Sequence, residues 1–250
     1  MGALFDETPV LYGGLHLAFA ALCIALNIAV FLLAKDRSED VLLRILWVLG
    51  LVMMISEVFK QWYLYNYLFD RQINLWYFPL QLCSVAMYLS FAARYLKGKA
   101  QDAVLVYLCT FSLLGAVMAL AYPENMLFRQ VVLTVHSFIY HSLIISEAII
   151  ALEILKKRER VPFRRALPLF GITVIIAELI NVLAKVLIND PVREPDMFYI
   201  SPFYPTTQPV FRTIADRFGT VPEIMIYLLC LTLAAYLIYL LEKKICYKNY

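Results

Sequence analysis

Seven apolar runs of membrane-spanning length dominate this sequence and restrict the folds open to it. The hydrocarbon core of a bilayer is about 30 Å thick, so one helical crossing takes about 20 apolar residues. With 62% hydrophobic residues, 16% charged residues and a mean hydropathy of +0.73, the chain differs strongly from a soluble domain. The pattern predicts an all-α membrane protein in which residues 1–250 form one bundle of seven transmembrane helices. The expected spans are 11–34, 41–59, 76–96, 102–122, 131–155, 166–188 and 221–241.

Basic residues are distributed unevenly between the connections. If the connections alternate between two sides, 15 of the 22 Lys and Arg residues lie on the side of the C-terminus. The positive-inside rule then places the N-terminus outside and the C-terminus in the cytoplasm, as in a multi-pass protein of the cell membrane. The basic block at residues 156–165 would face anionic lipid headgroups, or act only as a topology anchor. We expect no nucleic-acid partner, and the oligomeric state stays open.

The cysteines and histidines do not form a recognisable metal or disulfide pattern. The five cysteines have no CxxC spacing, and four of them lie in apolar runs, so we expect neither a disulfide framework nor a zinc site. The three histidines lack an HExxH motif, which disfavours a metal-dependent hydrolase. The last span has no lysine for a Schiff base, which disfavours a retinal-type sensor. We therefore expect no metal and no cofactor.

The connection at 189–220 is the only long loop, and the topology places it outside. Its five prolines prevent regular structure over much of its length, while its aromatic residues favour the headgroup region. We expect this loop to fold over the outer mouth of the bundle. Its end, PVFRTIADRFG, starts with proline, stops at glycine and groups its apolar residues on one face. That pattern predicts a short amphipathic helix at the membrane interface.

Polar side chains in four of the predicted spans fall mostly in the outer half of the bilayer. Ionisable groups are costly at that depth, so they should face an internal cavity and pair with one another. Glu57 would pair with Lys60 or Lys185, and Glu178 with Lys185. The alternative is that these charges are only ion-paired contacts between helices. The residues concerned are Glu57, Lys60, Gln81, Cys83, Ser84, His136, His141, Glu147, Glu178, Asn181 and Lys185.

Cys83 is the candidate nucleophile among them. If Pro79 begins the third helix, Cys83 lies one turn inside it, where the helix dipole favours a thiolate. A histidine within hydrogen-bond reach would complete a Cys–His pair able to form a thioester. The depth along the fifth span favours His136 as this partner, although a tilted helix would also bring His141 within reach. The alternative is that Cys83 is an inert, packed side chain.

Several short segments of the sequence resemble the YwaF-like integral membrane family. A eukaryotic transmembrane ether-phospholipid acyltransferase is similar to that family. The segments are FPLQLCS, YHSLI, Asn181, SPFYPTTQPVF and FGTVPEIMIYLL. The resemblance implies a seven-helix protein with an external N-terminus. It also implies that Cys83 carries the acyl group and that His141, rather than His136, is its partner. The bacterial pattern often has a histidine where this chain has Gln81.

The leading hypothesis is therefore a membrane-embedded acyltransferase that moves fatty acyl chains between phospholipids or lysophospholipids at the outer leaflet. Cys83 would be the nucleophile and His141 the general base. The remaining polar residues would contact the substrate: Gln81, Ser84, His136, Asn181, Glu57, Lys60, Glu178 and Lys185. The alternative is a transporter or lipid-binding protein that uses the same polar cavity. Such a transporter needs a water-lined route to the cytoplasm, and the inner halves of the spans offer few polar residues for one.

Overall fold

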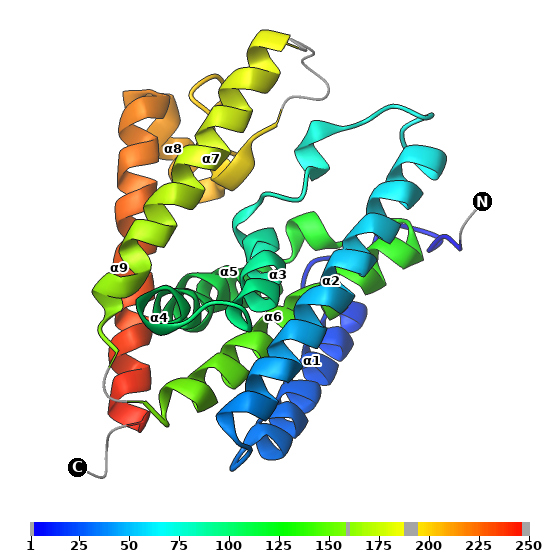
Figure 1. The fold of residues 1–250 in the computed structure, drawn as a ribbon. Coiled ribbons are helices and arrows are strands. Elements are labelled where there is room, and N and C mark those ends of the chain that lie inside the picture. The colour runs from blue at the N-terminus through cyan, green and yellow to red at the C-terminus, as the bar shows by residue number, and fades with distance from the viewer. Residues whose placement is uncertain (1–2, 159–160, 188–194, 247–250) are drawn as a thin grey trace.

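The computed structural model describes residues 3–158, 161–187 and 195–246, with side chains as far as residue 244. Within these ranges the regular structure is helical, apart from one β-bridge between Leu4 and Gln130 (Figure 1). The α-helices are α1 (Gly14–Ala34), α2 (Glu39–Tyr67), α3 (Leu82–Ala93), α4 (Gly98–Tyr107), α5 (Leu113–Ala121), α6 (Val131–Leu155), α7 (Ala166–Leu187), α8 (Pro209–Phe218) and α9 (Thr220–Cys246). The short elements are η1 (Leu75–Tyr77), η3 (Glu124–Met126), η4 (Phe163–Arg165) and η5 (Met197–Tyr199), which are 3-10 turns, and the π-helix η2 (Leu108–Ser112), which joins α4 to α5.

Six helices of the described chain are long and apolar enough to cross a membrane, which confirms the predicted helical membrane fold. The predicted span 131–155 coincides with α6, and 102–122 corresponds to the continuous stretch α4–η2–α5. The third span differs, because α3 has only 12 residues, or about 18 Å of helix. This length is too short to cross a core of about 30 Å.

The start of α3 corrects one prediction. Pro79 does not begin the helix: Pro79 and Leu80 form a turn in which the Leu80 N–H donates to the Phe78 carbonyl at 2.8 Å. The helix begins at Leu82, and Gln81 occupies the N-cap position. Cys83 is therefore the second residue of α3, nearer to the helix start than the sequence suggested.

The connections rich in basic residues gather at one end of the bundle. Arg158, just after α6, forms salt bridges with Glu39 at the start of α2 and with Asp102 on α4. The N-terminal segment lies at the other end, where Leu4 pairs with Gln130 before α6. This arrangement agrees with the grouping of connections used for the topology. Which end faces the cytoplasm stays a prediction.

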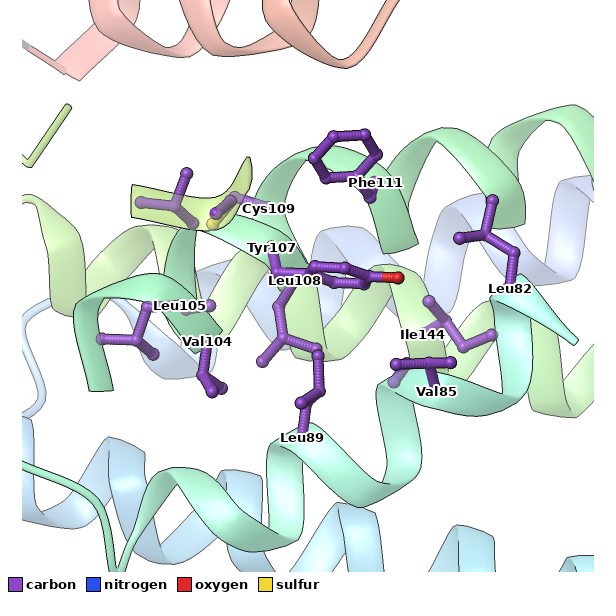
Figure 2. Close-up of a cluster of buried hydrophobic side chains, with 14 of the residues drawn as sticks. Leu82, Val85, Leu89, Val104, Leu105, Tyr107, Leu108, Cys109, Phe111 and Ile144 are labelled. Atoms are coloured by element: carbon purple, nitrogen blue, oxygen red, sulfur yellow. The ribbon is translucent and has the colours of Figure 1, made fainter. Parts of the chain in front are cut away.

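The core lies where α3, α4, η2 and α6 meet. Figure 2 shows Val85 and Leu89 of α3 facing the side chains of Leu108 and Tyr107. A few polar side chains are buried on the same elements, among them Ser90 of α3 and Glu147 of α6. On the other side of α3, Gly50 of α2 lies so close to the α3 backbone that any side chain there would meet Phe91. Close backbone approach through small residues is a common way for membrane helices to associate.

The long connection contains the amphipathic helix that its sequence predicted. Helix α8 starts at Pro209 and ends before Gly219, whose φ of 88° suits glycine. Helix α8 packs on α9, where the ring of Phe211 meets Tyr227 edge-on at 4.9 Å. Val210 and Phe218, also apolar, stay exposed on α8. The described part of the loop ahead of α8 forms η5 and lies across the ends of α3 and α7.

Candidate functional site

A cavity of about 690 Å³ opens at the end of the bundle where α3 begins. This volume is typical of a pocket for a small molecule or for part of a lipid. Its walls come from α2, α3, α5, α6, η5, α8 and α9, and most of the lining is apolar. Six of the residues singled out in the sequence line it: Lys60, Gln81, Cys83, Ser84, His136 and His141. The other four with a predicted role at the site are Glu57, Asn181, Glu178 and Lys185, and they stand outside the lining.

The first turn of α3 places the Cys83 thiol beside free backbone donors. The Ser84 N–H already donates to the Gln81 carbonyl at 2.8 Å. The N–H groups of Leu82 and Cys83 have no hydrogen-bond partner among the described residues, as is usual at a helix start. Unpaired donors and the positive end of the helix dipole favour negative charge at this point. A thiolate or an oxyanion would therefore be stabilised here.

The Cys83 side chain is partly exposed to the cavity and has no hydrogen bond within the described part of the chain. One neighbour of Sγ is Gly115 on α5: a Cβ atom on that glycine would lie 3.3 Å from Sγ. Cys83 thus lines the cavity and also packs against α5. Its role as a nucleophile, rather than as an inert packed side chain, stays a prediction.

Hydrogen bonds fix the tautomers of both cavity histidines. The Nδ1 atom of His141 lies 2.8 Å from the Ser137 carbonyl, and Nε2 of His136 lies 3.2 Å from the Ser56 carbonyl. A carbonyl oxygen only accepts, so these nitrogens carry the proton in the neutral rings. His141 therefore keeps a lone pair on Nε2, and His136 keeps one on Nδ1. Each ring can act as a base.

Packing between helices indicates which histidine lies at the depth of Cys83. The Cys109 thiol donates to the Ala148 carbonyl at 3.4 Å, which aligns η2 with α6. Counted six residues along each of these antiparallel helices, Gly115 comes roughly level with Ser142, and a Cβ atom on Gly115 would lie 3.3 Å from the Cys83 sulfur. His141 neighbours Ser142 in sequence. His136 lies five residues earlier in α6, which places it about 7.5 Å closer than His141 to the N-terminal end of that helix. This register favours His141, although no hydrogen bond joins these two described side chains.

The predicted pairing of Glu57 with Lys60 is confirmed. Their side chains form a salt bridge of 2.7 Å one turn apart on α2, and Gln61 also donates to Glu57 at 2.8 Å. Glu57 is buried and Lys60 reaches the cavity wall, so the pair presents its cationic end to the cavity. Lysine is a common ligand for phosphate groups. Lys185, the other predicted partner, lies over the ring of Tyr204 at 5.0 Å.

Gln81 and Asn181 hold the loop that covers the cavity. The Gln81 amide accepts from the Phe198 N–H at 2.9 Å and donates to the Asp196 carbonyl at 3.2 Å. Asn181 accepts from the Met197 N–H at 2.7 Å and donates to the Met197 carbonyl at 3.2 Å. Each of these side-chain amides therefore forms the hydrogen bonds that the backbone N–H and C=O groups of residues 196–198 would otherwise form with other backbone groups. The sequence predicted that Gln81 and Asn181 contact the substrate, and it did not predict that they bind the covering loop.

Asp196 belongs to the loop that covers the cavity, and the sequence did not single it out. Its carboxylate accepts from the Ser201 N–H at 2.8 Å inside the covering loop. Burial raises the pKa of Asp196 to about 7; the Ser201 hydrogen bond acts against this, and the nearby Glu178 adds to it. Glu178 itself stands outside the cavity, next to Asn181. This part of the loop is therefore sensitive to protonation.

Helix α6 carries two further polar groups. Tyr140 lines the cavity between the two histidines, with its buried hydroxyl near Ser84 of α3. Glu147, two turns further along α6, is fully buried near Ser90 of α3. The sequence placed Glu147 among the polar residues of this span but gave no sign that it would lie outside the cavity lining. Beyond this depth the bundle is closed by fully buried side chains such as Tyr107 and Phe111.

Comparison with known proteins gives a family for nearly the whole chain. Residues 11–243 match the model of the TMEM164 family, a family of transmembrane proteins, so the chain belongs to that family. No curated protein and no solved structure matches it. Membership confirms the membrane assignment, while the likeness to the YwaF-like family and the chemistry it implies stay predictions.

Proposed function

We propose that this member of the TMEM164 family is a membrane-embedded lipid acyltransferase with Cys83 as nucleophile and His141 as base. The observation that carries the proposal is the position of the Cys83 thiol. It lies in the first turn of α3, beside unpaired backbone N–H groups, in a cavity that also holds His141. These are the parts that acyl transfer through a thioester requires.

In the first step His141 Nε2 takes the proton from the Cys83 thiol, and the thiolate attacks an ester carbonyl of the donor phospholipid. The new S–C bond forms as the ester C–O bond breaks. The leaving lysophospholipid oxygen takes the proton back from His141, which leaves a thioester on Cys83. The N–H groups of Leu82 and Cys83 are the donors for the oxyanion, with the Ser84 hydroxyl beside them.

In the second step His141 takes the proton from the hydroxyl of an acceptor lysophospholipid, and that oxygen attacks the thioester. The S–C bond breaks, the new ester forms, and the thiolate recovers the proton from His141. Lys60 at the cavity wall suits the phosphate of either lipid. Gln81 and Asn181 contribute by holding the loop over the reacting groups.

The topology of the proposal follows the distribution of basic residues. The end that carries Arg158 would face the cytoplasm, and the cavity would open at the outer leaflet of the cell membrane. In this arrangement α3 is a seventh membrane-embedded helix of half length. The turn at Pro79 and Leu80 that precedes α3 would then lie within the membrane, at the depth of the cavity. Irregular backbone at such depth is tolerated where protein buries it or where it lines a cavity.

A channel or transporter is the competing function for this cavity. The described core speaks against it, because fully buried side chains such as Tyr107 and Phe111 surround η2 and the cavity lining does not reach the buried Glu147. A permeation route needs polar or water-filled space along its length. The following experiment distinguishes an acyltransferase from a protein that binds lipid but does not transfer acyl groups.

The test follows a labelled acyl chain from phosphatidylcholine to a lysophospholipid in proteoliposomes. Cys83→Ala should abolish transfer, and His141→Ala should lower it by about 10²- to 10⁴-fold. Cys23→Ser is the matched control, since Cys23 lies on α1 away from the cavity and serine keeps its hydrogen-bonding ability. The wild type should also hold a hydroxylamine-sensitive acyl group that Cys83→Ala lacks. Full transfer in Cys83→Ala or His141→Ala would refute the pair.

A further inference from the structure

Two helical stripes face each other on one side of the cavity. On α9 the lining residues recur at helical spacing, as do those on α5, so each helix presents one continuous face. The stripe on α5 consists of Leu114, Gly115, Met118 and Ala119, followed by Tyr122 at the end of the helix, and the stripe on α9 consists of Tyr227, Cys230, Leu231 and Ala234. Helix α9 packs mainly on η2 and α8 and touches α5 at few positions. A gap between α5 and α9 therefore remains part of the cavity wall.

This gap is open at the surface of the bundle. The two hydrophobic lining residues with the largest exposed fractions among those described are Val210 at 71% and Met118 at 57%. Met118 is on α5, and Val210 is in the first turn of α8, which packs on α9. Cys230 of α9 is also exposed. Since α5 and α9 belong to spanning helices, the gap faces the apolar interior of a membrane.

The gap leads to the Cys83 thiol. Gly115, on the α5 stripe, lies directly beside Sγ, and the neighbouring positions Ala119 and Ala234 are also small. Small residues on facing helices leave room for a chain between them, whereas larger ones would fill it. An extended apolar molecule in the gap would thus have its end next to the nucleophile.

The other approach is covered. Phe198 and Tyr199 of η5 lie over the end of the cavity, where Gln81 and Asn181 hold their backbone. The polar residues of the lining include Lys60 on α2 and His136 on α6, while the gap is lined mostly by apolar and small side chains of α5 and α9. The site is therefore amphipathic along its length, which matches a molecule with one polar and one hydrocarbon part.

We propose that the gap between α5 and α9 is a lateral portal that binds a fatty acyl chain of a glycerophospholipid and leads it from the bilayer to Cys83. This inference rests on the proposed function for the role of Cys83. It adds the route: the donor lipid enters sideways from the membrane, with its headgroup near Lys60 and its ester close to the thiol.

The test measures where a phospholipid binds to the protein and does not depend on acyl transfer. The Cys83→Ser variant is reconstituted with phosphatidylcholine that carries a diazirine on one acyl chain, irradiated and analysed by peptide mass spectrometry. We expect adducts on Leu82 and Tyr227, which line the cavity but are shielded from surrounding lipid, with only 8% and 5% of their surface exposed. Ala119→Phe and Ala234→Phe, one on each wall, should each lower these adducts about tenfold by filling the portal.

Ala18→Phe is the control, because Ala18 is exposed on α1 and does not line the cavity. It should leave the adducts unchanged, and thermal unfolding should show that all the variants fold. Adducts confined to lipid-facing residues such as Leu229, or unaffected by both wall variants, would overturn the portal. If adducts form on Leu82 and Tyr227 but wild-type protein transfers no acyl group, the portal stands and the acyltransferase fails. Transfer at the wild-type rate in both wall variants would refute the portal alone.

Discussion

The thiol of Cys83 on α3 rests against Gly115 on α5, where a Cβ atom would come within 3.3 Å of Sγ. The same Cβ atom would also approach the Leu82 side chain at 3.6 Å. The first distance is shorter than an ordinary van der Waals contact, so a methyl group here would displace the sulfur. The missing side chain therefore keeps space open beside the candidate nucleophile.

Replacing Gly115 with alanine should lower the reactivity of Cys83 without unfolding the protein. The methyl group narrows the space around Sγ, and the flexible thiol gives way more easily than backbone would. We expect alkylation of Cys83 by N-ethylmaleimide to slow about tenfold, equivalent to roughly 1.4 kcal/mol of barrier. Gly171→Ala is the control, because a Cβ atom there meets nothing within 4 Å. Equal alkylation rates in the two variants would show that Gly115 does not shape the site.

A second glycine substitution should destabilise the fold itself. A Cβ atom on Gly50 would lie 2.6 Å from the Phe91 backbone nitrogen and 2.7 Å from the Met87 carbonyl oxygen. Backbone atoms cannot rotate away, so Gly50→Ala must push α2 and α3 apart. We expect a loss of about 2–3 kcal/mol of stability, seen as a lower thermal unfolding midpoint in detergent. A midpoint matching that of Gly171→Ala would mean that the two helices are not packed this closely.

The helical architecture could be predicted from the sequence, because the length of each apolar run indicates whether a helix can cross the membrane. Hydrocarbon thickness sets the length of each run, and α6 begins and ends at the predicted residues. The start of α3 was less accessible, because Pro79 suits both a first helical turn and the preceding turn that the chain adopts. The π-helix η2 left no sequence signal, since its geometry arises from packing on α6 rather than from local preference.

Releasing the loop from Asn181 should expose the cavity. Asn181→Leu removes both partners of the Met197 backbone, and unpaired buried groups cost about 1–3 kcal/mol each. The amide of Ser201, which is protected by its bond to Asp196, should then exchange with solvent about a hundredfold faster. Asn66→Leu is the control, because Asn66 is exposed and bonds only within α2. Unchanged exchange in Asn181→Leu would show that the loop is held by other contacts.

Part of the candidate site followed from spacing, and part did not. Glu57 and Lys60 were paired correctly because residues three apart share a helix face. The contacts of Gln81 could not be predicted, because its partners lie more than 110 residues away in an irregular loop. The choice of His141 came from a resemblance, and only the packing of α6 on η2 gave it physical support.

The raised pKa of Asp196 makes loop stability depend on pH. Its pKa is about 7 in the folded protein against an ordinary value of 3.8, because burial disfavours the charged carboxylate. The folded state thus binds the proton more tightly, so its stabilising contribution is complete below pH 3.8 and is lost as the pH rises through 7. At 1.36 kcal/mol per pKa unit, the loss is at most about 4 kcal/mol.

Asp196→Asn provides the comparison, because an amide keeps an acceptor for Ser201 and does not titrate. Unfolding midpoints measured from pH 5 to pH 8 should fall more steeply in the wild type than in Asp196→Asn. Parallel curves would indicate that the loop carboxyl does not change its charge on unfolding.

The last prediction concerns Arg158, which joins three helices at the basic end of the bundle. Its guanidinium bonds to Glu39 of α2, to Asp102 of α4 at 2.7 Å and to the Gln101 side chain at 2.6 Å. Removing it leaves two carboxylates close together and only partly exposed. A fully buried pair broken in this way costs about 3–5 kcal/mol, and solvent screening at this depth should reduce the loss to about 1–3 kcal/mol.

Arg158→Ala should therefore lower the thermal unfolding midpoint, and raising the salt concentration should partly restore it by screening the repulsion between Glu39 and Asp102. Arg164→Ala is the matched control, because Arg164 is exposed in the same connection. The double variant Arg158→Ala, Asp102→Asn should recover stability relative to Arg158→Ala, since it removes one of the two carboxylates that Arg158 had bound, leaving no need for the longer Arg165 contact at 3.9 Å. If Arg158→Ala and Arg164→Ala unfold at the same temperature, the cluster does not hold α2, α4 and α6 together.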